Sequence, residues 1–352
     1  MTAPSPGSGT GSAAAATQDW WGTEEASVRY GDKLALDQVT FRAVPGQVSA
    51  VVGGDGAGRT TLLRCLAGAH AVSSGRVRLP APLRIGYLSA GSGTYPDLSV
   101  DENLAFRASA YRMPAAAARE RSREFVDRAG LAGARDRLAG QLSGGMRQKL
   151  GVIAAMLHQP DLLVLDEPTT GVDPVSRADL WWLIARAAAD GAAVVLATSY
   201  LDEAERAVEV LALDAGRVLA TGTPQEIIAA MPGTLRVSDA RPEGEDRRRS
   251  WRRGGGWRIW DPPGQPSRHI TDLRHQNLDE TDVIMTKNRE QSDVPGQPGD
   301  PGQAASSGTS GTVAPDLQDA VTVAILAREL AGAGELAATG LAGGRPEGDG
   351  PR

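Results

Sequence analysis

Two groups of residues in this chain have the types and spacing needed to act on a bound phosphate. The first is the glycine-rich run from Gly53 to Thr61, which matches G-x-x-x-x-G-K-[ST] except that Arg59 takes the lysine position. Glycines let consecutive backbone N–H groups converge on one anion, and a helix N-terminus adds partial positive charge. The second group is the acidic pair Asp166-Glu167. The simpler alternative for the glycine run is a turn between a strand and a helix.

The elements on either side of these residues are suited to position them. Residues 48–52 are apolar and β-branched and predict a buried strand, and residues 60–66 predict the helix that follows the glycines. Residues 162–165 predict a second buried strand, which ends in the acidic pair. Ligands of open parallel sheets bind at the carboxyl ends of the strands. We therefore expect a ligand site at this edge, although an acidic pair can also serve only as a helix cap.

The remaining pattern predicts an α/β fold. An antiparallel ribbon over residues 28–41 precedes the parallel core, and a helical region is inserted over about residues 97–145. Further strands are expected at 194–197, 208–213 and 218–222. Ser99-x-x-Glu102 and Thr223-x-x-Glu226 have the form of capping boxes, which mark helix starts.

Composition excludes several classes of function. A net charge of −6 and a pI near 5.4 give no global attraction to nucleic acid or to an anionic membrane, so such binding would need a local patch. The single cysteine, Cys65, cannot form an internal disulfide and suits a reducing cytoplasm. No run approaches the roughly 20 apolar residues that span a bilayer, so we expect a protein that is soluble or peripheral to a membrane. Only three of the 37 basic residues are lysines.

Four regions are predicted along the chain. Residues 1–24 are rich in small and polar residues and predict a disordered tail, and residues 25–231 form the regular domain. Residues 232–313 are expected to be a loosely ordered extension, followed by a terminal helix and tail over 314–352. The basic run 247–249 could meet lipid headgroups or nucleic acid, but a solvated run of charge is the commoner case.

The segment Leu142-Ser143-Gly144-Gly145-Met146-Arg147-Gln148 resembles the signature motif of ABC transporter ATPase subunits. The phosphate loop, this signature, the acidic strand, the turn from Pro168 to Pro174 and the segment 199–205 all occur in the order typical of that family. The resemblance covers about residues 26–231, and residues 315–326 resemble the terminal helix of the exporter-type branch. It implies a P-loop NTPase with a parallel-sheet core, an antiparallel β subdomain and an inserted α-helical signature subdomain.

The resemblance also implies ATP and Mg²⁺ as ligands and a head-to-tail pair of subunits. Tyr30 would stack on adenine, and backbone N–H groups of residues 56–61 would hold the phosphates. Thr60 would bind magnesium directly and Asp166 through the second shell, while Glu167 would polarise the attacking water. Ser143 and Gly145 would reach the partner's nucleotide, and Asp173 would couple the two sites. The nucleotide-binding set implied in this way is Tyr30, Gly53, Gly54, Asp55, Gly56, Ala57, Gly58, Arg59, Thr60, Thr61, Ser143, Gly144, Gly145 and Asp173.

Three positions depart from the family's pattern. Arg59 replaces a lysine, Ala90 stands where a glutamine usually contacts magnesium and water, and Ser199 stands where a histidine usually touches the γ-phosphate. Arginine keeps the charge of lysine but not its compact shape. The chain's general preference for arginine is the simpler explanation of Arg59. Taken together, the three changes predict a subunit that binds ATP with Mg²⁺ but hydrolyses it slowly or not at all at its own loop.

The expected function is therefore that of the ATP-binding subunit of an exporter. It would act on the cytoplasmic face of the cell membrane with a separate permease and a second ATPase subunit, identical or different, and no nucleic acid is expected. A regulatory or scaffold pseudo-ATPase is the main alternative. A soluble ABC protein of DNA repair or translation is less favoured, because the chain has one such domain and no sustained heptads. The product of a decaying gene is a further alternative.

Overall fold

The computed structural model describes residues 19–264 and 311–338. Its internal contacts divide the chain into two compact units, Met1–Ala229 and Ala230–Arg352. The first unit contains two sheets and the second contains one, and each unit is described by itself below.

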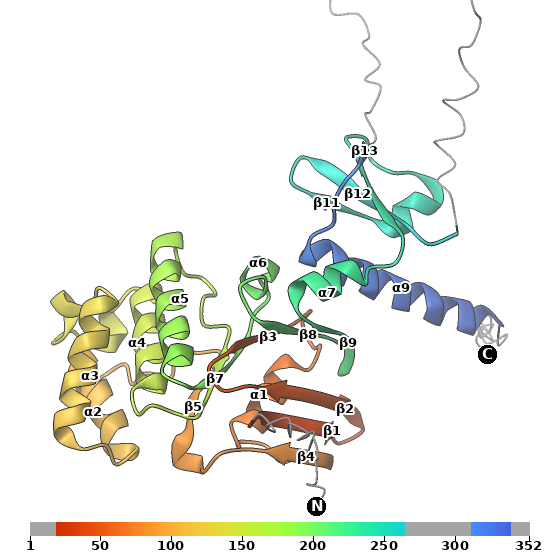
Figure 1. Ribbon diagram of the computed structural model, residues 1–352. Helices are drawn as coiled ribbons and strands as arrows, with labels where there is room; N and C mark the ends of the chain where they lie inside the picture. Colours follow the sequence, from red (N-terminus) through yellow and green to blue (C-terminus); the bar gives the residue numbers. More distant parts are fainter. Residues whose placement is uncertain (1–18, 265–310, 339–352) are drawn as a thin grey trace, which may run out of the picture. The chain divides into compact units, whose positions relative to one another are not determined.

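The first unit is built on a six-stranded sheet with the strand order β5-β6-β7-β3-β8-β9 (Figure 1). The first five of these strands are parallel to their neighbours, and β9 closes the edge antiparallel to β8. The strands are β3 (Val48–Gly53), β5 (Ile85–Leu88), β6 (Leu162–Asp166), β7 (Ala193–Ala197), β8 (Glu209–Asp214) and β9 (Arg217–Gly222). Every residue of β6 and β7 is buried, which explains why both read as continuous apolar runs. The predicted α/β fold with a parallel core is confirmed.

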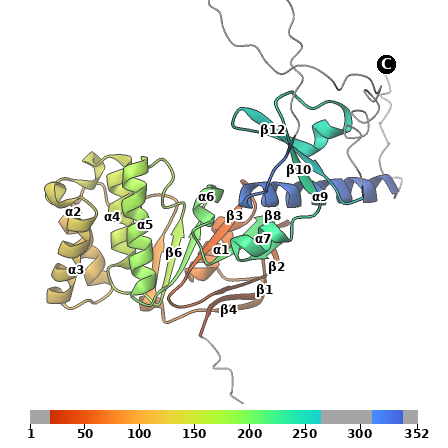
Figure 2. The ribbon, with the colours of Figure 1, turned by 45° about the horizontal axis from the view of Figure 1, so that its top comes forward.

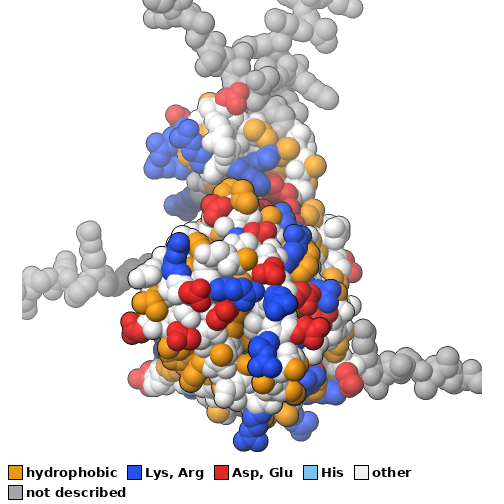
Figure 3. Space-filling view, turned by 90° about the vertical axis from the view of Figure 1, so that its left-hand side faces the viewer, with side chains coloured by type: hydrophobic (Ala, Val, Ile, Leu, Met, Phe, Trp, Pro, Cys, Tyr) orange, Lys and Arg blue, Asp and Glu red, His pale blue; other side chains and the backbone are white. Residues whose placement is uncertain are grey.

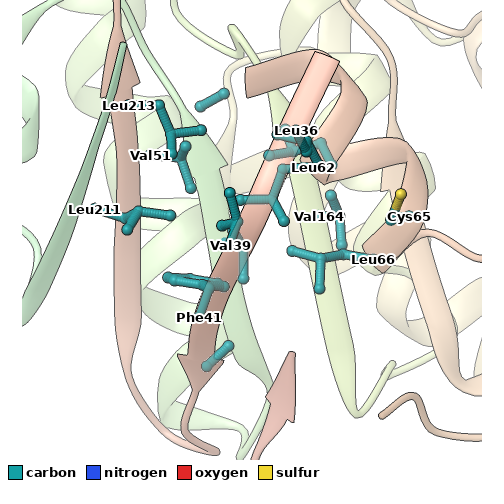
Figure 4. Close-up of a cluster of buried hydrophobic side chains, with 14 of the residues drawn as sticks. Leu36, Val39, Phe41, Val51, Leu62, Cys65, Leu66, Val164, Leu211 and Leu213 are labelled. Atoms are coloured by element: carbon teal, nitrogen blue, oxygen red, sulfur yellow. The ribbon is translucent and has the colours of Figure 1, made fainter. Parts of the chain in front are cut away.

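A three-stranded antiparallel sheet covers the helix that follows the glycine loop. Its order is β2-β1-β4, with β1 (Trp21–Tyr30), β2 (Lys33–Ala43) and β4 (Ser74–Arg78). The main core lies where this sheet, helix α1 (Arg59–Leu66) and the parallel sheet meet. Figure 4 shows Leu36, Val39 and Phe41 of β2 facing Leu62 and Leu66 of α1, with Val51 and Leu213 of the parallel sheet beside them. The loop is thus anchored on both sides by buried apolar side chains.

The longer helices of this unit gather at one end of the parallel sheet (Figures 1 and 2). They are α2 (Val100–Ala110), α3 (Ala115–Arg128), α4 (Gly144–Met156) and α5 (Pro174–Ala189). Short helices α6 (Leu201–Ala204) and α7 (Pro224–Ala229) follow β7 and β9. The predicted capping boxes of Ser99 with Glu102 and of Thr223 with Glu226 are both confirmed by reciprocal hydrogen bonds. In the lower part of the face shown in Figure 3, basic and acidic side chains are interspersed.

The prediction of a disordered tail over residues 1–24 is wrong at its end. Residues 21–24 belong to β1, and residues 1–18 lie outside the described part of the chain. Trp21 packs against the core cluster, and the buried Thr23 hydroxyl donates a hydrogen bond of 3.0 Å to the carbonyl of Val39. These tertiary contacts order a stretch whose composition favours a flexible chain.

The second unit corrects the prediction of a loosely ordered extension over residues 232–313. Four antiparallel strands form a sheet of order β11-β12-β10-β13, and helix α9 packs against it through Val323. The elements are β10 (Thr234–Ser238), a 3-10 helix (Gly244–Arg249), β11 (Ser250–Arg253), β12 (Gly256–Asp261), β13 (Gly311–Thr312) and α9 (Leu317–Ala338). Buried Arg236 pairs with Asp261 through two hydrogen bonds, so the strands tolerate charges that composition alone assigns to solvent. Residues 265–310 of the predicted extension lie outside the described residues.

The expected terminal helix of the second unit is present as α9, and its last described residue is Ala338. Of the basic run, Arg249 is paired with Asp246 whereas Arg247 and Arg248 are exposed. Of the helices that the structure describes, none combines the length and the apolar character needed to cross a bilayer.

Candidate functional site

The glycine loop joins β3 to α1 and adopts a conformation that requires its glycines. Gly53 and Gly58 have φ values of 156° and 104°, a region that side chains of L-residues rarely adopt. A Cβ atom at Gly58 would lie 2.7 Å from the carbonyl oxygen of Ala35. The loop is closed by hydrogen bonds from the Ala57 N–H to Gly54 and from the Gly216 N–H to Ala57. It is therefore a fixed cradle that opens at a helix N-terminus, a geometry suited to an anion.

An open cavity of about 260 Å³ lies over this loop. The structure brings together here most of the residues that the sequence assigns to nucleotide binding. Tyr30, which is 43% exposed, lines one side of the cavity, and its ring centroid lies 4.9 Å from that of His70. The lining residues are Tyr30, Lys33, Ala35, Gly54, Asp55, Gly56, Ala57, Gly58, Arg59, Thr60 and Thr61. An aromatic side chain and a row of backbone donors around one cavity can bind a base and its phosphates.

Asp166 is the last residue of β6 and is 2% exposed. Burial raises the pKa of its carboxyl group, and a hydrogen bond with Thr60 opposes this increase. Its Oδ2 atom is buried without a hydrogen-bond partner. A buried carboxylate oxygen without a donor is satisfied by a cation or by water bound to one. Mg²⁺ is usually bound by one or two oxygen side chains together with substrate phosphates. Asp166 and Thr60 therefore fit this ion.

Glu167 follows Asp166 in a left-handed backbone conformation, with φ of 52°. Non-glycine residues in this region cost about 1–3 kcal/mol and occur mainly where surrounding contacts fix them. The Glu167 N–H donates to the carbonyl of Ala197 at 3.0 Å, and the side-chain amide of Gln148 donates to the carbonyl of Glu167 at 3.2 Å. These contacts fix the backbone of Glu167 at the edge of the sheet.

Both carboxylate oxygens of Glu167 are occupied by this chain's own donors. Oε1 accepts a hydrogen bond from Nη1 of Arg59 at 2.5 Å. Oε2 accepts from the hydroxyl of Thr170 at 2.7 Å, and from the backbone N–H and hydroxyl of Ser199 at 3.3 and 3.2 Å. The Arg59 and Glu167 side chains are only 12% and 18% exposed, so water screens their attraction weakly. Arg59 reaches Asp55 only at 3.9 Å, and its main partner is therefore Glu167.

Of the two other departing positions, one joins this network. Ser199 follows β7 and donates both of the hydrogen bonds to Glu167 described above. Ala90 lies two residues beyond β5, which pairs with β6 so that Leu88 stands opposite Leu165. The register places Ala90 at the same edge of the sheet as Glu167, where its exposed methyl group offers no polar atom.

The signature residues lie at the start of α4, apart from the glycine loop of this chain. The hydroxyl of Ser143 caps this helix by accepting from the Met146 N–H at 3.2 Å. A Cβ atom at Gly145 would lie 3.5 Å from a carboxylate oxygen of Asp173, and Asp173 itself caps α5. Among the described residues, no hydrogen bond or ion pair links the segment 143–145 to the loop 53–61. Ser143 and Gly144 are exposed and open to a partner.

Sequence reasoning missed two side chains that organise this edge. Gln148 connects the signature helix to the backbone of Glu167, as described above. Glu203 is 2% exposed and accepts hydrogen bonds from Thr169 at 2.7 Å and Thr198 at 3.0 Å, which ties the loops after β6 and β7 together. In the sequence, Glu203 is marked only by its place four residues after Ser199 and beyond an apolar strand. An ordinary acid at the start of a helix has the same placement, so the sequence does not single Glu203 out.

Comparison with protein-family models matches residues 36–170 to the family described as ABC transporter. Among curated relatives, the daunorubicin resistance ATP-binding protein DrrA3 of Streptomyces coeruleorubidus is 37% identical over 219 residues, covering 59% of this chain and 69% of that protein. The Nod factor export ATP-binding protein I of Cupriavidus metallidurans is 37% identical over 210 residues, covering 56% of this chain and 69% of that protein.

A further relative is much longer than the matched region. The probable multidrug ABC transporter ATP-binding protein YbhF of Escherichia coli is 37% identical over 212 residues, and the match spans 57% of this chain but only 37% of YbhF. Among solved structures, an ATP-binding subunit of an ABC transporter superposes with a TM-score of 0.57 at 26% identity, covering 60% of this chain and 92% of that one. The cbiO1 protein of Clostridium perfringens gives a TM-score of 0.53 at 25% identity, covering 60% and 90%.

Proposed function

The chain belongs to the family of ABC transporter ATP-binding proteins, and from that premise we propose that it is the ATP-binding subunit of an exporter that works with a separate membrane permease. The names of DrrA3, of the Nod factor export protein and of YbhF refer to drug resistance, export and multidrug transport, and they support export as the direction of transport. A subunit of this kind would sit at the cytoplasmic face of the cell membrane.

ATP would bind in the cavity over the glycine loop. Tyr30 would stack on the adenine ring, and the N–H groups of residues 56–61 would bind the phosphates. Thr60 would hold Mg²⁺ directly and Asp166 through a bound water molecule. When bound, this ion neutralises charge on the phosphate oxygens. The buried and unpartnered Oδ2 of Asp166 supports this assignment.

The observation that carries the rest of the proposal is the engaged carboxylate of Glu167. To polarise an attacking water, Glu167 needs a free carboxylate oxygen directed at that water. Here Oε1 is bound by Arg59, and Oε2 is bound by Thr170 and Ser199. We therefore propose that this subunit binds ATP but hydrolyses it weakly or not at all at its own loop.

The size of the defect follows from how such sites work. Loss of one preorganised group that stabilises the transition state typically lowers the rate by about 10²–10³. Arg59, Ala90 and Ser199 surround one reaction centre, so their effects are not additive and cannot be multiplied. Binding depends mainly on the backbone N–H groups of the loop, and these remain in place.

The position of the signature residues supports a role for this chain in a pair of ATPase subunits. Ser143 and Gly144 are exposed at the N-terminus of α4, apart from this chain's own loop. In a head-to-tail pair, Ser143 and Gly145 would reach the γ-phosphate bound by the partner, and Asp173 would couple the two sites. A second ATPase subunit with a complete loop, acting beside this one, is the assembly that we favour.

The test is ATP binding and turnover by the purified full-length chain. We expect the unmodified chain to bind ATP with Mg²⁺ and to turn it over far below the roughly 10 s⁻¹ of a typical enzyme. Combining Arg59→Lys with Ala90→Gln should raise turnover by about tenfold or more, since it restores two groups at the reaction centre. Arg29→Lys is the matched control, because Arg29 is exposed on β1 outside the cavity lining. Brisk turnover by the unmodified chain would contradict impaired hydrolysis, and absence of ATP binding would contradict the whole proposal.

The engaged Glu167 also favours a second function, that of a regulatory or scaffold protein which uses bound ATP as a switch and drives no transport. Purification from the native cell under mild detergent separates the two. A stoichiometric partner with several membrane spans supports the transporter subunit. Recovery without any membrane protein, from cells in which the chain is abundant, supports the regulatory alternative.

A further inference from the structure

One positively charged side chain that lines the cavity, that of Lys33, has been given no role so far. Lys33 lines the cavity together with Tyr30 and the glycine loop. It is the first residue of β2 and stands directly opposite Tyr30 across the β1–β2 pair. Directly opposite residues of an antiparallel pair project from the same face. Tyr30 and Lys33 are therefore presented to the cavity side by side from one hairpin.

The charges around the cavity make Lys33 distinctive. The charged residues that line it are Lys33, Asp55 and Arg59. Arg59 pairs with Glu167 at 2.5 Å and approaches Asp55 at 3.9 Å, so its charge is largely neutralised within the chain. Lys33 is exposed, and the described residues contain no ion pair to it. Among the described residues that line the cavity, Lys33 is therefore the positive side chain that remains available to a triphosphate.

Lysine is also a rare choice in this protein. Only Lys33, Lys149 and Lys287 occur among 37 basic residues. Lys149 is buried and binds Asp179 and the carbonyl of Ala129, which is a structural role. Lys287 lies outside the described residues. An ammonium group on a flexible stem binds phosphate as a compact point charge, whereas the planar guanidinium of arginine needs a matching fork.

We propose that Lys33 binds the phosphates of the nucleotide and supplies the compact ammonium group that the loop lacks at residue 59. This inference rests on the proposed function, because it assumes that a nucleotide occupies the cavity. The hairpin then contacts two parts of the ligand, with Tyr30 against the base and Lys33 against the phosphates. Binding consequently selects nucleotides that carry a polyphosphate and stays independent of the Arg59 pairing with Glu167.

The experiment measures nucleotide affinity for the full-length chain and three variants, with ATP, ADP and adenosine as ligands and Mg²⁺ present. Lys33→Ala should weaken ATP binding by about tenfold, the usual effect of losing a hydrogen bond to a charged group. It should change adenosine binding little and should make the dependence of ATP affinity on salt shallower. Lys33→Arg should retain part of the affinity. Arg29→Ala, which removes an exposed cation from the neighbouring strand outside the cavity, should leave ATP binding unchanged.

The outcomes distinguish this inference from the function on which it rests. If the unmodified chain binds no ATP, the proposed function fails. If it binds ATP and Lys33→Ala binds equally well, the assignment of Lys33 fails while the function stands. Equal weakening of ATP and adenosine by Lys33→Ala would also overturn the assignment, because it would show that the hairpin, and not a phosphate contact, had been disturbed. Thermal unfolding of each variant checks that an exposed substitution leaves the fold intact.

Discussion

The phosphate loop and the signature helix lie in the same unit, yet their side chains are engaged to different degrees. Around the loop stand Arg59, Ala90 and Ser199, the three positions predicted to depart from the family pattern, and two of them bind Glu167. In the signature, Ser143 caps α4 and the two glycines that follow are retained. The loop keeps a closed backbone cradle while its side chains bind one another, and the signature leaves Ser143 and Gly144 exposed. Under the proposed function, this difference teaches that nucleotide binding, hydrolysis and completion of a partner's site are separable within one domain.

The largest expected effect comes from the signature. In a transporter complex purified through a tag on this chain, Ser143→Arg should lower ATP turnover by about 10²-fold or more, because it removes a donor from the partner's nucleotide site. Arg59→Ala in the same complex should change turnover much less. ATP binding to this chain's own loop should be unaffected by Ser143→Arg.

The control for that experiment is Ser143→Thr, which keeps the hydroxyl that caps α4. Undiminished turnover with Ser143→Arg, together with strong loss from Arg59→Ala, would reverse the comparison. It would place the active chemistry at this chain's own loop.

The second prediction tests whether the loop is still built as a cradle. Gly58→Ala should lower the free energy of unfolding by about 3 kcal/mol, since its φ of 104° and the Ala35 carbonyl 2.7 Å from the new Cβ both oppose a side chain. Gly54→Ala is the matched control, because a Cβ there meets nothing within 4 Å. Urea unfolding of both variants measures the difference. Equal stability of the two would show that the loop relaxes easily.

The smallest expected effect is a loss of stability at acid pH that comes from His158. His158 follows α4, is buried and stacks on Tyr111 with ring centroids 3.5 Å apart. Burial, with a smaller contribution from the positive charges of Arg84, Arg107 and Arg121, lowers the pKa of His158 from 6.5 to about 4. Between these two pKa values the unfolded chain binds more protons than the folded chain. The stability is therefore complete above pH 6.5 and is lost as the pH falls toward 4.

Stability should accordingly fall by about 2 kcal/mol between pH 6.5 and pH 5, at up to roughly 1.4 kcal/mol per pH unit from this residue. The measurement is urea unfolding followed through the pH range. His158→Phe keeps an aromatic ring against Tyr111 and removes the titration, so its curve should be flatter by that amount. An identical pH dependence in both proteins would show that other groups dominate the acid response.

Much of the fold could be predicted because its signals are local. The apolar strand at 162–165, the glycines of the loop and the boxes begun by Ser99 and Thr223 each lie within a few residues of the structure they determine. The strand over residues 21–24 and the sheet of the second unit could not be predicted, because distant partners order them. Thr23 bonds to Val39, and Arg236 pairs with Asp261.

The same limit applies to the site. The sequence identifies Arg59, Glu167 and Ser199 as three separate positions. It does not reveal that one carboxylate joins them, since Arg59 lies 108 residues from Glu167 and Ser199 lies 32 residues away. Nor does hydropathy distinguish the buried Glu203 from an ordinary exposed acid at the start of a helix.

The shared carboxylate of Glu167 has a consequence for how substitutions at this site combine. Arg59 holds one of its oxygens, and Ser199 and Thr170 hold the other, so the side chain stays restrained when either Arg59 or Ser199 alone is replaced. Under the proposed function, Arg59→Lys or Ser199→His alone should therefore raise turnover little, and the second substitution should raise it more in the background of the first, which is positive epistasis.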